Sequence, residues 1–126
     1  MTYTAATHCK NDHSEWLNSF DFYKREFDIL EKRLQEVAQK NTGTEFMSWV
    51  EHFQNQFVVQ RNNIDELKHS IHVHAAKVAE DAQKHAGKME SVLVAEHDQV
   101  KEQIKDFEKI VNDLRHEFNL FLAKWM

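Results

Sequence analysis

Apolar residues recur along most of the chain in alternating steps of four and three, which is the spacing of a heptad repeat. The longest such stretch covers residues 46–85 and contains neither proline nor glycine, so nothing in it ends a helix. At about 1.5 Å per residue it predicts a helix roughly 60 Å long, which needs partner helices to bury its stripe. The stripe positions are Phe46, Val50, Phe53, Phe57, Gln60, Ile64, Leu67, Ile71, His74, Val78, Asp81 and His85.

Two further stretches repeat the same spacing on either side of this segment. Residues 1–11 are polar and predict an N-terminal arm, after which Asp12 is placed to cap a helix. The segments 41–44 and 86–88 interrupt the pattern and contain the two glycines, Gly43 and Gly87, so they predict turns. We therefore expect helices at about 12–40, 45–85 and 90–125 in a single domain that spans residues 1–126.

Three heptad-patterned helices joined by short turns predict an all-α fold, an antiparallel up-down-up three-helix bundle. In shape this architecture resembles a spectrin-type repeat. The block VEHFQNQFVVQRNNIDELKH and the ending FLAKWM resemble small, uncharacterised bacterial all-helical proteins. Neither resemblance carries a catalytic motif or implies an activity, so the function has to be argued from the residues.

Composition limits the classes of function. The chain has 126 residues, 29% of them charged, and its net charge of −5 with no run of lysine or arginine argues against nucleic acid as a partner. A single cysteine excludes an internal disulfide and fits a reducing compartment. Because the sequence also has neither the apolar run of a transmembrane segment nor the features of a signal peptide, we expect a cytoplasmic protein.

Polar residues replace apolar ones at one end of the predicted bundle. Extending the first helical stripe backwards reaches His13 and then Cys9. Folding the helices back at the two turns pairs His13 with His74, and Cys9 with His97. Imidazole and thiolate are the usual ligands of zinc and copper, so Cys9, His13, His74 and His97 form a candidate metal site.

Two other interpretations of these histidines stay open. Polar residues in the core of a long bundle often fix how its helices align, and the same applies to Gln60. Histidines at a solvated or pH-sensitive bundle end need no metal either.

Apolar residues exceed the stripe at the opposite, aromatic end. Exposed apolar patches commonly mark contacts with other molecules, although a wide stripe would also account for them. We therefore expect a non-enzymatic structural or interaction module that self-associates, most simply as a homodimer, or binds a protein partner. The residues expected to form this surface are Met47, Trp49, Leu120, Leu122, Trp125 and Met126.

Motifs of the common enzyme classes are absent from the sequence, which has no glycine-rich phosphate loop, no nucleophile elbow and no HExxH. The segments Glu66–His69 and Asp113–His116 have the spacing of di-iron ligand pairs. The heptad pattern places these four side chains on outward positions, whereas di-iron ligands point inward. We therefore do not expect an enzyme.

Overall fold

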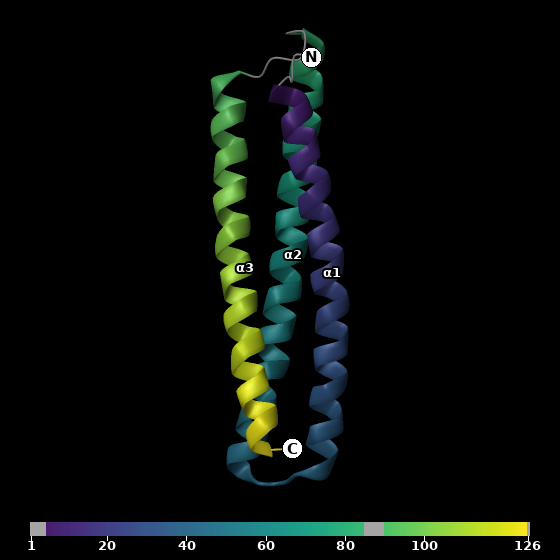
Figure 1. Ribbon diagram of the computed structural model, residues 1–126, viewed down its shortest axis with the longest axis vertical. Coiled ribbons are helices and arrows are strands. Elements are labelled where there is room, and N and C mark those ends of the chain that lie inside the picture. The colour runs from purple at the N-terminus through teal and green to yellow at the C-terminus, as the bar shows by residue number, and fades with distance from the viewer. Residues whose placement is uncertain (1–4, 85–89, 126) are drawn as a thin grey trace.

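Three long helices form a bundle in the computed structural model, which describes residues 5–84 and 90–125, and each helix runs antiparallel to the one before it in the chain (Figure 1). They are α1 (Ala5–Lys40), α2 (Thr44–Lys84) and α3 (Ser91–Trp125), and these described ranges contain no strand. The predicted three-helix bundle is confirmed. The predicted turn at 86–88 and His85 lie outside the described residues. None of the three described helices has the apolar length that a membrane-spanning helix needs.

The first helix begins earlier than the sequence indicated. It starts at Ala5, so the predicted polar arm is wrong over residues 5–11, which form the first turns of α1. The cap assigned to Asp12 is also wrong, because this residue lies inside the helix and its carboxylate accepts a hydrogen bond from His97. As a result Cys9 belongs to the bundle, where its side chain is buried.

The turn between α1 and α2 is closed by local hydrogen bonds. Gly43 has a φ of 128°, a backbone conformation that glycine adopts without strain, and its carbonyl accepts a bond from the amide of Met47. The Asn41 side chain donates to the carbonyl oxygens of Val37 and Trp125, each at 3.1 Å. This asparagine therefore ties the end of α1 to the end of α3.

Aromatic side chains dominate the core between this turn and the middle of the bundle. Phe53 is fully buried, and its ring lies 5.1 Å from that of Phe118 and 5.0 Å from that of Phe121. Such contacts add stability beyond simple area burial. The apolar cluster extends towards the other end as far as Phe20, Ile71 and Val100.

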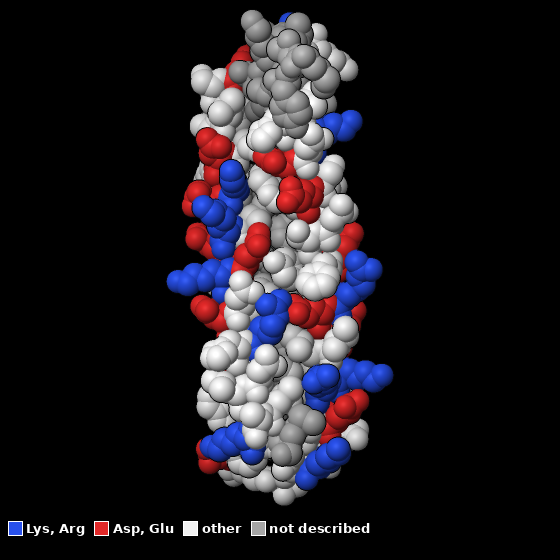
Figure 2. All heavy atoms as spheres, viewed as in Figure 1, with Lys and Arg blue, Asp and Glu red and all other residues white. Residues whose placement is uncertain are grey.

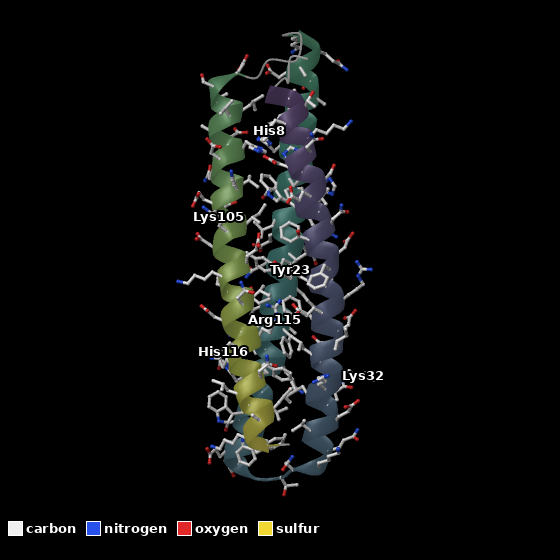
Figure 3. The ribbon with its side chains drawn as sticks, in the orientation of Figure 1. His8, Tyr23, Lys32, Lys105, Arg115 and His116 are labelled. Atoms are coloured by element: carbon white, nitrogen blue, oxygen red, sulfur yellow. The ribbon has the colours of Figure 1, made fainter. Side chains whose placement is uncertain are left out.

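Ion pairs on the surface follow the helix interfaces. Lys68 pairs with Asp21 and Lys24 with Asp65 across α1 and α2, while the Arg115 guanidinium binds both carboxylate oxygens of Glu26 across α1 and α3. Positive and negative side chains are intermixed over the face in Figure 2, and Figure 3 places Arg115 between α3 and α1. Exposed pairs of this kind contribute little each, so burial of the apolar stripe is the main stabilising term.

Replacement of Gln60 tests whether a polar residue in the apolar stripe fixes the helix alignment. Gln60 is buried, and its side-chain oxygen accepts a bond from the partly exposed Asn63 at 3.0 Å. In Gln60→Leu, water can accept the hydrogen bond that Asn63 now donates to Gln60, and the new leucine side chain is apolar. We therefore expect the variant to raise the free energy of unfolding by about 1 kcal/mol in urea titrations. A lower free energy of unfolding, or a change in oligomeric state, would show instead that Gln60 fixes the alignment.

Candidate metal centre

The four residues predicted as metal ligands come together at the end of the bundle opposite the α1–α2 turn. Cys9 and His13 lie one helical turn apart on α1 and therefore share a face, while His74 comes from α2 and His97 from α3. All four are buried, with exposed fractions of 1%, 5%, 3% and 7% in that order. Every helix of the bundle thus contributes to one cluster of donor atoms.

The donor atoms are close to the separations expected around a single ion. The Cys9 Sγ lies 3.3 Å from His13 Nε2, 3.8 Å from His74 Nδ1 and 3.0 Å from His97 Nδ1. The His13 Nε2 and His74 Nδ1 atoms are 3.1 Å apart, and all four donor atoms lie within 4.8 Å of one another. Four tetrahedral ligands at zinc bond lengths would be about 3.3–3.6 Å apart. Small side-chain shifts would bring the four atoms to that geometry.

The three imidazole rings surround one point. Their centroids are 5.2 Å apart for His13 and His74, 5.4 Å for His13 and His97, and 5.5 Å for His74 and His97. Rings bound through one nitrogen each to a shared tetrahedral ion would have centroids about 5 Å apart. The nearly equal sides of this triangle match that arrangement.

Hydrogen bonds on the outer side of the cluster orient two of the rings. His74 Nε2 donates to the carbonyl oxygen of Leu93 at 2.9 Å, and His97 Nε2 donates to the carboxylate of Asp12 at 2.8 Å. Both oxygens can only accept, so Nε2 carries a proton in each ring, and in a neutral ring the inward Nδ1 then has a free lone pair. Metal-ligating histidines are usually held in this way by a carbonyl or carboxylate.

Without an ion the surroundings of His13 and Cys9 favour the uncharged forms of these two side chains. Burial is the main cause that lowers the pKa of His13 to about 4, and the neighbouring His74 and His97 lower it further. Burial also raises the pKa of the Cys9 thiol to about 11, with a smaller contribution from the negative charge of Asp12. A bound cation reverses this preference for the thiol, because it stabilises the thiolate.

Asp12 belongs to the candidate site, although its sequence position suggests a helix cap. Its carboxylate holds His97 at 2.8 Å and also lies 3.5 Å from the ring of His8, one turn earlier on α1. The assignment of Asp12 as a helix cap hid this role. The sequence does place Asp12 next to His13 and three residues after Cys9. If the first helix is extended back to Cys9, all three residues lie on it, which would have indicated that Asp12 is near the site.

The structure exposes three of the residues predicted to form the interaction surface and buries another. Met47, Trp49 and Leu120 are exposed, with fractions of 41%, 38% and 60%. Leu122 is buried in the core, so its placement on an exposed surface is wrong. The face that α3 buries against two neighbouring helices is wider than a two-position heptad stripe and includes both Phe121 and Leu122.

Of the last two residues of the predicted surface, the structure describes Trp125 alone. Trp125 is partly buried and packs against Phe46, with ring centroids 5.2 Å apart. Met126 lies outside the described residues. The exposed apolar patch that remains is centred on Trp49 and Leu120.

The two segments with di-iron spacing do not form a second centre. Glu66, His69, Asp113 and His116 are all exposed, as the heptad pattern predicts, and Figure 3 shows His116 on the outside of α3. Among the described residues, the one group of histidine, cysteine and carboxylate side chains close enough to hold a metal ion is the buried cluster.

Comparison with known proteins adds no family to this description. No family model matches the chain, and neither the search of curated proteins nor that of solved structures found a match. The interpretation of the site therefore depends on its geometry.

Proposed function

We propose that this protein is a transition-metal-binding helical bundle that holds zinc through Cys9, His13, His74 and His97. The observation that carries the proposal is the convergence of four buried donor atoms, from three helices, within 4.8 Å of one another. The outer hydrogen bonds to Leu93 and Asp12 support it, since they leave two imidazole lone pairs facing the centre.

One thiolate and three imidazoles favour zinc, with copper as the competing ion. Catalytic zinc sites keep one coordination position for water or substrate, whereas structural sites fill all four with protein ligands. The cluster supplies four protein ligands, none more than 7% exposed. We therefore propose a structural or regulatory metal rather than a catalytic one.

Titration of the metal-free full-length chain with zinc and with cobalt(II), a spectroscopic substitute for zinc, tests the proposal. We expect one ion per chain, a cobalt–thiolate absorption band and the release of about one proton near pH 7, because the protonated Cys9 thiol must become a thiolate. Elemental analysis of untagged protein purified without chelator measures the metal acquired in the cell.

Two histidine variants make a matched pair for this titration. His74→Ala removes a buried ligand, whereas His116→Ala removes an exposed histidine from α3. We expect His74→Ala to lose stoichiometric binding and His116→Ala to keep it. Equal binding by the two variants, or no binding of zinc or copper by the wild type, would contradict the proposal.

We propose self-association through the aromatic end as a second function. A groove of ≈ 210 Å³ is lined there by the apolar side chains of Trp49, Leu120, Phe121 and Trp125, and by Glu117 and Lys124. A two-fold dimer places the same patch against itself, so a patch that carries both charge signs can complement its own copy. This combination favours a second copy of the chain as the partner.

Charge introduced at the centre of this patch should prevent the self-association. We expect wild-type protein to sediment as a dimer at tens of micromolar, and Trp49→Lys to sediment as a folded monomer with unchanged helical circular dichroism. Ile29→Lys, on α1, is the control, since Ile29 is also an exposed apolar residue but lies outside the groove. A monomeric wild type would contradict the prediction.

A further inference from the structure

We infer that metal occupancy controls whether the first turns of α1, residues 5–15, are packed against the rest of the bundle. The inference rests on the proposed zinc site and assigns it a regulatory role. In the metal-bound state all three helices are joined at this end. In the metal-free state residues 5–15 separate from α2 and α3, while the aromatic part of the bundle stays folded.

The apolar core is divided unequally between the two ends. The main cluster contains the phenylalanine-rich core and ends on α1 at Phe20, with Trp16 packed against it. The second cluster has three buried members, Cys9, Val78 and Leu93, and Ala6 packs against it. Burial of so few apolar groups gives residues 5–15 little hydrophobic attachment of their own.

Packing between α1 and α2 is also loose beside the metal ligands. A groove of ≈ 400 Å³ lies there, and His13 forms part of its wall. The α2 side is built mainly from the small side chains of Ala75, Ala79 and Ala82. Small side chains make few dispersion contacts across a gap, so this interface stabilises the first turns of α1 weakly.

The neighbouring ends of α2 and α3 have connections that do not involve α1. His74 Nε2 donates to the carbonyl of Leu93, and the Glu90 amide donates to the carboxylate of Asp81 at 3.1 Å. Lys77 also lies 3.7 Å from Glu96. These contacts hold α2 to α3 at this end when α1 is displaced, so α1 is the element expected to move.

A metal ion would attach α1 directly to both neighbours. Two of the four ligands, Cys9 and His13, come from α1, and the other two come from α2 and α3. Where folding creates the site, the binding free energy of the metal becomes folding free energy of the segment that carries the ligands. Segments with few buried apolar contacts open most readily, so the effect of the metal is concentrated in residues 5–15.

Amide hydrogen exchange of the full chain, measured by mass spectrometry with zinc and with a chelator, tests this inference. We expect zinc to slow exchange in residues 5–15 by at least about tenfold, since ligand binding suppresses local opening. Exchange in residues 111–122, which contain the aromatic core of α3, should change far less. Zinc uptake is measured on the same samples, so binding and ordering are recorded separately.

Two alanine variants of α2 provide a matched control for the loose interface. Ala79→Leu places a larger side chain in the groove, whereas Ala76→Leu changes an exposed position outside the groove. In the presence of chelator, we expect Ala79→Leu to slow exchange in residues 5–15 and Ala76→Leu to leave it unchanged.

Several results would overturn the inference while leaving the proposed zinc site intact. Stoichiometric zinc binding with unchanged exchange in residues 5–15 would mean that the end is closed without metal. Equal slowing along the whole chain would mean that zinc stabilises the bundle globally. Equal exchange in Ala79→Leu and Ala76→Leu would show that the loose interface between α1 and α2 does not cause the opening of residues 5–15. Absence of zinc binding would instead refute both the site and its regulatory role.

Discussion

We expect excess zinc to raise the free energy of unfolding of the metal-free protein by about 4 kcal/mol when free zinc is about 1,000 times its dissociation constant. For a chain of this length the melting temperature then rises by roughly 10 °C or more. The reason is that the four proposed ligands, which come from three helices, converge only in the folded bundle. Thermal unfolding followed by circular dichroism, with zinc and with chelator, measures the shift.

His74→Leu separates the metal effect from the stability of the bundle itself. The variant loses one proposed ligand and the hydrogen bond to Leu93, but it places an apolar side chain at a buried stripe position, so we expect the metal-free variant to be about as stable as the wild type. Its melting temperature should not respond to zinc. His116→Leu, changed at an exposed histidine, should respond as the wild type does. A wild-type melting temperature that changes with neither zinc nor copper would contradict the proposed metal site.

We expect acidification from pH 7 to pH 4 to lower the stability of the metal-free protein by about 3 kcal/mol through His13 alone. The pKa of His13 is lowered to about 4 in the folded protein, mainly by burial, against an ordinary value of 6.5 in the unfolded chain. Between these values the unfolded state binds more protons, so stability falls as the pH falls through this window. Well above pH 6.5 the ring is neutral in both states and the effect disappears.

Urea titrations in chelator at pH 7 and pH 4 isolate this contribution by comparison with His13→Leu. Carboxylates also lose favourable interactions in acid, but they do so in both proteins. We therefore expect the wild type to lose about 3 kcal/mol more than the variant over this range. His116→Leu should behave as the wild type. A loss of equal size in wild type and His13→Leu would contradict the assignment.

The sequence predicted those parts of the fold that depend on side-chain periodicity. Because inward positions repeat in steps of four and three, the buried stripe of α2 from Phe46 to Asp81 was identified almost residue by residue, with Leu67 partly rather than fully buried. The pairing of His13 with His74 and of Cys9 with His97 followed from the same repeat, and these pairs lie 3.1 Å and 3.0 Å apart.

The heptad pattern did not predict which hydrogen-bond partner a side chain has or how many helices it packs against. Asp12 has the sequence signature of a helix cap, and only the position of His97 in space shows that its carboxylate has another partner. Leu122 lies off the two-position stripe, yet it is buried because α3 packs against two helices at once. Whether the four ligands hold a metal depends on binding free energies that no heptad pattern contains.

Cys9 is the only cysteine of the chain, and it lies inside the cluster with 1% of its surface exposed. An alkylating reagent therefore has a single thiol to modify, and modification requires both access to the sulfur and its thiolate form. Burial blocks the first, and the pKa of about 11 suppresses the second. The rate of alkylation of Cys9 therefore measures how often the buried end becomes accessible to solvent, and the measurement needs no engineered label.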